Sequence, residues 1–349
     1  MLRAVIFDLD DTLIPEAAAI RAAFAATCGP AEERLELPPG SLVETVEAVA
    51  RTRYQILDTK GYCSRFGVSW EECLWGRFGP ASQKQLPGLG AVAETLRHFV
   101  WSDALVALGR SSPLAPGELD SRYAAERRVR LRPFPEAEAL LSSLQDRALL
   151  LACVTNGASE VQREKLVASG LERFFDEVLI SGEEGIGKPD PAILRRACDR
   201  LGVETWEAIY VGNSRMRDIA AARAAGMQSV LVQRFEPDEA DEPGAAAEPD
   251  RVVYEVHGLL GFVDGWRWGR TFRVLDPRRM PITVDEPVGE DGRWTTRLGP
   301  EGDELRPAVR GSSPLRTIEA ALRNLRARSA ADVWRWELGE PVDWDALLR

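Results

Sequence analysis

The sequence of 349 residues predicts an α/β protein: a doubly wound parallel sheet with an inserted α-helical cap and a small C-terminal α+β module. Three observations lead to this fold. An apolar strand at the N-terminus ends on acidic residues, residues 15–130 have a helical pattern, and strands alternate with helices from about residue 132 onward. Such alternation is typical of a parallel sheet that carries helices on both faces.

Composition and charge restrict the class of protein. A content of 45% apolar and 28% charged residues is typical of a soluble globular protein. The net charge of −11 argues against nonspecific binding to nucleic acids or membranes. No apolar run approaches the roughly 18 residues of a membrane helix, and a first strand that begins at about Arg3 leaves no room for a signal peptide. The five cysteines form no C-x-x-C pair, which favours reduced thiols. We therefore expect a cytoplasmic protein without membrane or nucleic acid partners.

The first strand, which includes residues 5–7, runs directly into Asp8-Leu9-Asp10-Asp11-Thr12. Because strands are pleated with a period of two, Asp8 and Asp10 project from one face, about 7 Å apart along the chain. Two close carboxylates repel each other and raise each other's pKa, and a divalent ion such as Mg²⁺, which prefers oxygen ligands, relieves this repulsion. In open α/β sheets, ligands bind at the C-terminal ends of strands. These acids are therefore candidate metal and catalytic residues.

Residues 15–130 are predicted to form helices inserted after this first strand. Residues 41–57 carry Leu42, Val46 and Val49 at helical spacing, and residues 91–105 and 119–129 look similar. The turn-rich stretches that separate these helices are 29–40, 76–90 and 109–117. The pattern predicts a cap over residues 15–130, between core segments 1–14 and 131–264.

The core segment after residue 131 alternates strands with helices. Strands are expected at residues 149–154, 177–180, 208–211 and 229–232, with a short strand and a closing helix after Arg251. Helices are expected between them, one ending at Ser169, one capped by Asp190 and one over residues 219–225. The acidic, Pro- and Ala-rich segment 236–250 is read as a loop.

The C-terminal residues 265–349 differ in composition, with more tryptophan and denser turns, and are predicted to form a separate α+β module of unknown role. Six of the ten tryptophans lie in residues 266–349. Ser313-Pro314 is expected to open a helix with one apolar stripe. Residues 266–273 interleave arginine with aromatic residues, a pattern that can stack on bases or bind phosphates. The expected structure is nevertheless an ordinary strand with arginine on one side and aromatic residues in the core. A protein partner of this module is left open.

Chemically active side chains follow four of the predicted core strands. The sets are Asp8 with Asp10, Thr155 with Asn156, Lys188, and residues 213–218 with Asp218. The helix that begins near Thr155 offers an anion site. Lys188 is one of only four lysines in a chain that otherwise uses arginine, which indicates a need for a compact ammonium. Because these strand ends meet at one edge of a parallel sheet, we expect the four sets to lie together.

Four motifs in this order resemble the haloacid dehalogenase (HAD) superfamily, and its phosphatase branch with a helical cap after the first motif in particular. They are Asp8-Leu9-Asp10-Asp11-Thr12, Thr155-Asn156-Gly157, Lys188-Pro189, and Gly212-Asn213-Ser214 with Asp218. The resemblance covers roughly residues 1–264. It implies a HAD-like Rossmannoid core and a Mg²⁺-dependent phosphomonoester hydrolase that acts on a small soluble phosphate ester through an aspartyl-phosphate intermediate.

The resemblance also implies a role for each motif residue. Asp8 is the expected nucleophile and Asp10 the general acid and base. Lys188 is expected to pair with Asp8 and with the phosphoryl group, which Thr155 and Asn156 also hold. The expected Mg²⁺ ligands are the Asp8 carboxylate, the Asp10 carbonyl and the Asp218 carboxylate, with Asn213 reaching the ion through water.

One departure from the family pattern and two alternatives stay open. The family often has an acid at the position of Asn213, so we expect weaker Mg²⁺ binding but retained activity. The presence of Asp10 favours phosphoryl transfer over dehalogenation, because a halide needs no proton on leaving. A sugar-phosphate mutase shares all four motifs. A weakly active or inactive binding or regulatory protein with this fold is the second alternative.

Overall fold

The computed structural model describes most of the chain up to residue 264 and six short strands beyond it. The described residues are 2–57, 63, 66–110, 116–234, 247–264, 272–275, 281–285, 294–298, 309–311, 333–335 and 340–342. The chain divides into two compact units, Arg3–Phe262 and Met1–Leu2 with Val263–Arg349. Each unit is described by itself.

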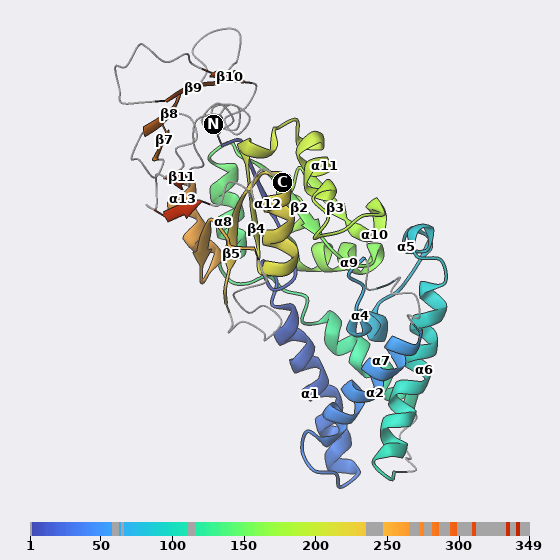
Figure 1. The fold of residues 1–349 in the computed structure, drawn as a ribbon. Coiled ribbons are helices and arrows are strands. Elements are labelled where there is room, and N and C mark those ends of the chain that lie inside the picture. The colour runs from blue at the N-terminus through green and yellow to red at the C-terminus, as the bar shows by residue number, and fades with distance from the viewer. Residues whose placement is uncertain are drawn as a thin grey trace. The chain divides into compact units, whose positions relative to one another are not determined.

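The first unit contains a six-stranded parallel sheet with the order β3-β2-β1-β4-β5-β6 (Figure 1). Its strands are β1 Ala4–Phe7, β2 Leu150–Thr155, β3 Glu177–Ile180, β4 Ala208–Gly212, β5 Gln228–Val232 and β6 Arg251–Val253. In the register, Phe7 pairs with Cys153 of β2 and with Val211 of β4, so the residues that follow these three strands emerge at one edge. The predicted doubly wound parallel sheet is confirmed.

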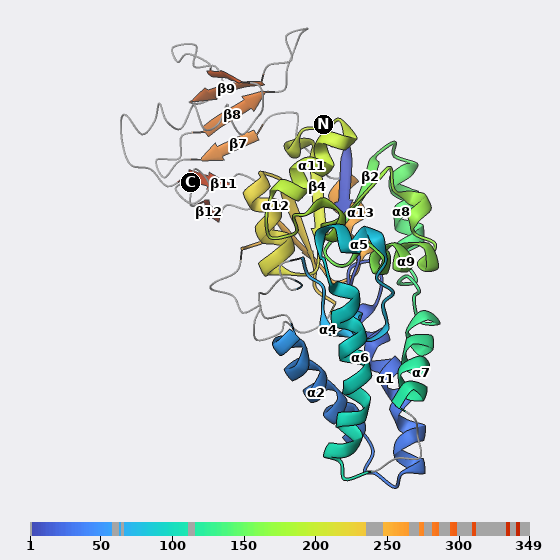
Figure 2. The ribbon, with the colours of Figure 1, turned by 90° about the vertical axis from the view of Figure 1, so that its right-hand side faces the viewer.

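Helices cover both faces of this sheet. On one face α11 (Ala192–Leu201) and α12 (Ala220–Ala225) share a buried core with strand residues such as Ile6 and Val154. On the other face lies α8 (Ala137–Gln145), so the sheet is enclosed between helices (Figure 2). The remaining core helices are α9 Ser159–Ser169, η1 Glu172–Phe174, α10 Ser181–Glu184, η2 Thr205–Glu207, η3 Arg215–Ile219, η5 Val256–Gly258 and α13 Leu259–Asp264. Burial on both faces explains why the core strands are continuous apolar runs and not alternating patterns.

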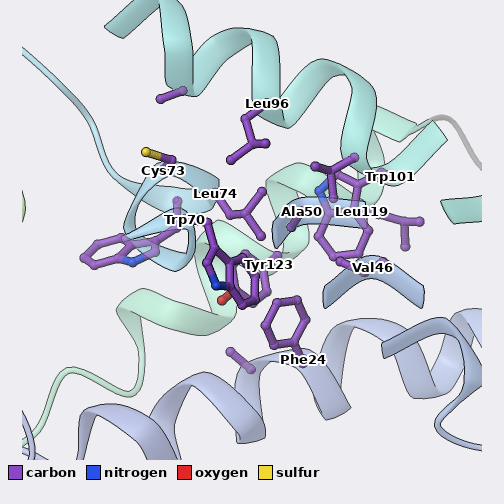
Figure 3. Packing of buried hydrophobic residues seen from close by; sticks show 14 of the residues in the cluster. Phe24, Val46, Ala50, Trp70, Cys73, Leu74, Leu96, Trp101, Leu119 and Tyr123 are labelled. Atoms are coloured by element: carbon purple, nitrogen blue, oxygen red, sulfur yellow. The ribbon is translucent and has the colours of Figure 1, made fainter. Parts of the chain in front are cut away.

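The chain between β1 and β2 folds into helices, most of which share a hydrophobic cluster (Figure 3). These cap helices are α1 Glu16–Arg34, α2 Ser41–Leu57, α4 Trp70–Trp75, α5 Pro80–Gln85, α6 Leu89–Ala107 and α7 Pro116–Arg128. Phe24 of α1 stacks on Tyr123 of α7 with ring centroids 4.4 Å apart. The cluster continues to Ala158 and Val161 at the start of α9, so the cap helices pack directly on the core.

Two turn-rich stretches expected from the sequence are partly helical. Helix α1 continues through Pro30 to Arg34, because the next residues stay buried and the Glu32 carboxylate accepts hydrogen bonds from Gly40 N and Leu42 N. The stretch 76–90 contains α5, whose first turn donates to the Glu160 carboxylate of α9. The α1 contacts lie beyond the helix itself and the α5 contacts reach a residue almost 80 positions away, so local turn propensity reveals neither.

The second unit contains another six-stranded sheet, with the order β10-β9-β8-β7-β11-β12 and antiparallel neighbours. Its strands are β7 Phe272–Leu275, β8 Pro281–Asp285, β9 Trp294–Leu298, β10 Val309–Gly311, β11 Val333–Arg335 and β12 Glu340–Val342. The strand expected over residues 266–273 falls on β7 only at its last two residues. The rest of that strand, the helix expected after Ser313 and most of the loop 236–250 lie outside the described residues.

Candidate active site

The ammonium of Lys188 lies between two carboxylates at the C-terminal edge of the sheet. Its Nζ is 2.6 Å from Asp8 Oδ1 and 2.8 Å from Asp218 Oδ1. Strand pairing fixes Asp8, whose backbone N–H donates to Val211 O of β4. All three side chains are buried. The structure thus brings together three of the residues singled out from the sequence.

The Asn156 side chain holds the loop that carries Lys188. Its Nδ2 donates to Lys188 O at 2.8 Å and its Oδ1 accepts from Lys188 N at 2.9 Å, and the peptide bond from Lys188 to Pro189 is cis. A Cβ on Gly187 would lie 2.9 Å from Asn156 Oδ1, so this close approach requires glycine. The amide of Asn156 therefore positions Lys188, a contact that the sequence did not suggest.

Tyr210 of β4 completes the hydrogen bonding of Lys188. It was not among the site residues predicted from the sequence. Its hydroxyl accepts from Lys188 Nζ at 2.8 Å and lies 3.1 Å from Asp218 Oδ1, to which it donates. Burial, followed by the nearby carboxylates, raises the pKa of this hydroxyl well above its ordinary value, so it stays a donor. A single polar side chain inside an otherwise aliphatic strand was the available signal.

A π-helical turn, η3, presents Asp218 to Lys188. Its Oδ2 accepts from Asn213 N at 3.1 Å and from Ser214 N at 2.9 Å. Burial alone would raise the pKa of Asp218, but attraction to Lys188 and these hydrogen bonds outweigh burial and lower it. A Cβ on Gly212 would lie 2.5 Å from Asp218 Cγ, so glycine is needed where β4 ends.

Asp8 is electrostatically less well compensated than Asp218. Burial raises the pKa of its carboxyl to about 7, because attraction to Lys188 only partly offsets burial, and Asp218 and Asp10 repel the ionised form. The negative charge at this edge of the sheet therefore exceeds what Lys188 neutralises.

A second buried ammonium holds Asp10. Lys165 Nζ of α9 lies 3.1 Å and 2.9 Å from the two carboxylate oxygens, and Gln162 Nε2 donates to Oδ2 at 3.1 Å. Gln162 Nε2 also donates to Thr155 Oγ1 at 2.6 Å, which links the buried Thr155 hydroxyl to Asp10. Burial raises the pKa of Asp10 despite the attraction to Lys165.

Lys165 and Gln162 were not predicted from the sequence. The rarity of lysine, which pointed to Lys188, applies equally to Lys165, and helical spacing places residues 162 and 165 on one side of α9.

Mg²⁺ needs hard oxygen donors, and carboxylates at this edge of the sheet supply them. Among the residues that the structure describes, no group of three or more Asp, Glu, His or Cys side chains is arranged to hold a metal ion. The chemistry nevertheless fits, because the carboxylates of Asp8 and Asp218 are oxygen donors with excess negative charge, and Mg²⁺ keeps several waters in such sites. Asp10 would add its backbone carbonyl.

Comparison with known proteins found a matching family and several similar phosphatases. The sequence model of the haloacid dehalogenase-like hydrolase family matches residues 2–226. The chain is 36% identical over 262 residues to a phosphoserine phosphatase of Thermus thermophilus, which covers 74% of this chain and 98% of that protein. It is 31% identical over 234 residues to a glyceraldehyde 3-phosphate phosphatase of Methanothermobacter thermautotrophicus, covering 66% of this chain and 86% of the relative.

Among solved structures, an L-2-haloacid dehalogenase of Xanthobacter autotrophicus is 21% identical with a TM-score of 0.48, covering 76% of this chain and 99% of that one. The family model ends at residue 226, well before the second unit begins. The resemblance expected from the four motifs is confirmed, and so is the expectation of an enzyme. The chain belongs to the haloacid dehalogenase-like hydrolase family and is an enzyme of its phosphatase type.

Proposed function

We propose that this enzyme hydrolyses a small soluble phosphate monoester in the cytoplasm, with Mg²⁺ and through an aspartyl-phosphate formed on Asp8. The observation that carries the proposal is the Lys188 ammonium, 2.6 Å from Asp8 and 2.8 Å from Asp218 at the end of β1. An ammonium at this position orients the Asp8 carboxylate and can neutralise a phosphoryl oxygen that approaches it.

Two carboxylates divide the chemistry. An Asp8 oxygen attacks phosphorus while the bond from phosphorus to the leaving oxygen breaks, and the protonated Asp10 carboxyl gives its proton to that oxygen. The Asp10 carboxylate then takes a proton from water, whose oxygen attacks phosphorus and releases phosphate and the Asp8 carboxylate. Burial raises the pKa of Asp10, which favours the protonated form that the acid role requires.

Other residues bind and orient the transferred group. Lys188 would pair with a phosphoryl oxygen, and the start of α9 beside Thr155 and Asn156 would offer backbone N–H groups to the others. Bound Mg²⁺, held by Asp8, the Asp10 carbonyl and Asp218, with Asn213 reaching it through water, would supply charge neutralisation at this point.

Contacts between cap and core support a small substrate. Ser181 Oγ of the core donates to Phe66 O at 2.5 Å, and Arg128 Nε of α7 donates to Glu164 Oε1 of α9 at 2.6 Å. A cap packed this closely excludes water and bulky esters. The relatives' names specify phosphoserine and glyceraldehyde 3-phosphate, both small esters. Among the described residues, no helix is both apolar and long enough to cross a membrane.

Solvent oxygen incorporation tests hydrolysis directly. In ¹⁸O-labelled water, the enzyme is expected to release phosphate that carries one solvent oxygen, because water attacks the aspartyl-phosphate at phosphorus. Mass spectrometry of phosphate released from a panel of small phosphate esters measures this. Transfer of the phosphoryl group between sugar hydroxyls without label would identify the mutase alternative. Absence of turnover across the panel would favour a binding protein.

The metal requirement gives a separate prediction that uses Asn213. Chelation is expected to abolish turnover and added Mg²⁺ to restore it. The Asn213→Asp variant is expected to lower the Mg²⁺ concentration for half-maximal activity by about three- to tenfold, because another carboxylate strengthens binding of a hard cation. Titrations of wild type, Asn213→Asp and the neutral control Asn213→Ser measure this. Equal midpoints for the wild type and the aspartate variant would contradict a position near the ion.

A further inference from the structure

A cluster of buried ionisable side chains joins cap and core beside Asp10. Lys165 Nζ lies 3.0 Å from Glu16 Oε1 of α1 and 3.5 Å from Glu72 Oε1 of α4, in addition to its contact with Asp10. Arg127 Nη2 of α7 donates to the same Glu16 oxygen at 2.7 Å. Three carboxyl groups thus share two cations, Lys165 and Arg127.

Several polar atoms around this cluster have no hydrogen-bond partner among the described residues. Acceptors and donors both occur: Glu16 Oε2, Glu72 Oε2, Trp75 Nε1, Tyr123 Oη, Arg127 Nε and Arg127 Nη1. Their side chains are buried, and that of Arg127 is completely so. Because an unmatched buried polar atom is costly, natural proteins keep such groups for a ligand, water or ion.

The unpartnered atoms come from neighbouring positions on the cap helices. Tyr123 and Arg127 are four residues apart on α7 and so lie on one face of that helix. The Arg127 guanidinium lies over the Trp75 ring, 5.2 Å from its centroid. Donors therefore gather where α4 and α7 meet, while the unpartnered carboxylate oxygens of Glu16 and Glu72 belong to the groups that hold Lys165 beside Asp10.

The loop that binds phosphate in the proposed reaction lies against the same cluster. A Cβ on Gly157 would be 2.9 Å from Glu72 Oε1, so glycine lets this cap carboxylate reach the start of α9. Asp10, which would protonate the leaving oxygen, shares Lys165 with Glu16 and Glu72. The cluster is therefore placed to contact the leaving group of the ester.

We propose that this cluster is the leaving-group subsite and that it selects an O-phosphorylated α-amino acid. The unpartnered oxygens of Glu16 and Glu72 accept hydrogen bonds from the α-ammonium, and Arg127 with Tyr123 donates to the α-carboxylate. The inference rests on the proposed phosphatase function and adds the substrate class. It accounts for the presence of both unmatched acceptors and unmatched donors.

The state of Glu72 agrees with this assignment. Burial raises the pKa of its carboxyl to about 8, because attraction to Lys165 compensates only in part and Asp10 and Glu16 oppose its ionisation. A substrate ammonium would favour the ionised form. Glutamine has the shape of the protonated carboxyl, so Glu72→Gln keeps the packing while it removes the charge that binds the ammonium.

Four phosphate esters test the ammonium-binding and carboxylate-binding parts of this subsite separately. O-phosphoserine carries both groups, O-phosphoethanolamine only the ammonium, 3-phosphoglycerate only the carboxylate, and p-nitrophenyl phosphate neither. The wild-type kcat/KM is expected to be at least about tenfold higher for O-phosphoserine than for each other ester, because each unmatched buried group discriminates against a ligand that lacks its partner. Phosphate release under Mg²⁺ measures all four.

Variants assign the preference to residues. Glu72→Gln is expected to lower the ratio of kcat/KM for O-phosphoserine to that for the aryl ester by about 10- to 100-fold, the loss of one charged hydrogen bond. Arg127→Lys, which keeps the charge but removes the planar donors, is expected to lower this ratio for O-phosphoserine and 3-phosphoglycerate. The matched control is Glu164→Gln, which removes a carboxylate from the same cap–core contact outside the cluster.

The outcomes distinguish the two proposals. Aryl phosphate hydrolysis with equal kcat/KM for all four esters would overturn the subsite and leave the phosphatase function intact. A preference for O-phosphoserine that Glu72→Gln changes no more than Glu164→Gln does would also overturn it. Failure to hydrolyse any of the four esters would overturn both proposals. If Arg127→Lys does not fold, the Glu72→Gln ratio decides.

Discussion

Replacing Asp8 with asparagine is expected to lower kcat for any phosphate ester by at least about a thousandfold, since the amide cannot act as the attacking carboxylate. The fold should persist, because asparagine has the same shape and Lys188 keeps its contact with Asp218 at 2.8 Å. Turnover of p-nitrophenyl phosphate, together with thermal unfolding of both proteins, measures the two effects separately.

The control for this variant is Asp190→Asn, which makes the same chemical change at an exposed residue two positions after Lys188. It should leave kcat within about twofold of the wild-type value, as is usual for exposed positions. An Asp8→Asn enzyme that keeps wild-type turnover would show that the nucleophile lies elsewhere. A variant that unfolds would direct the test to trapping phosphate on Asp8 in the wild-type enzyme.

Replacing Lys165 with methionine is expected to give the largest loss of stability. The variant leaves Asp10, Glu16 and Glu72 without the ammonium that lies within 3.5 Å of each of them. Removing one partner from a buried charged group costs about 3–5 kcal/mol in the free energy of unfolding. Urea unfolding of the variant and the wild type at pH 7 measures the difference. The same substitution at the exposed Lys84 is the control and should change it by less than about 0.5 kcal/mol.

The stability that Lys165→Met loses should increase with pH, because the folded variant and its unfolded chain bind different numbers of protons. Without Lys165 the buried carboxyls have pKa values above those of the unfolded chain, so the folded variant binds more protons. The variant is then most stable below the carboxyl pKa values of the unfolded chain, about 4. Its stability falls as pH rises through the higher pKa values of the folded state. Unfolding at pH 5 and pH 8 should show a steeper fall in the variant than in the wild type. Parallel pH dependences would mean that Lys165 does not compensate these acids.

The sequence alone located much of the core and one half of the site. The strand expected over residues 177–180 and the helices expected to span residues 41–57 and to end at Ser169 have those bounds in the structure. Asp8, Lys188 and Asp218 meet as expected, because the C-terminal ends of parallel strands must share one edge. The roles assigned to these residues and the division of the first unit into cap and core stay predictions.

The other half of the site could not be predicted in the same way. Lys165 and Asp10 are 155 residues apart, and their contact depends on the rotation of α9 about its axis, which sets the direction of its polar side chains. Glu16, Glu72 and Arg127 come together only because three cap helices bury one shared cluster. Local periodicity states which face of a helix is apolar but not which distant side chain meets its polar edge.

The sequence by itself therefore determined the sheet, the order of its strands along the chain and the acids and lysine at its C-terminal edge, since these follow from local patterns and from the geometry of parallel strands. Only the tertiary structure decided how the cap closes on α9 and which buried charges compensate one another. Those pairings depend on long-range packing and on the high cost of burying a charge without a partner.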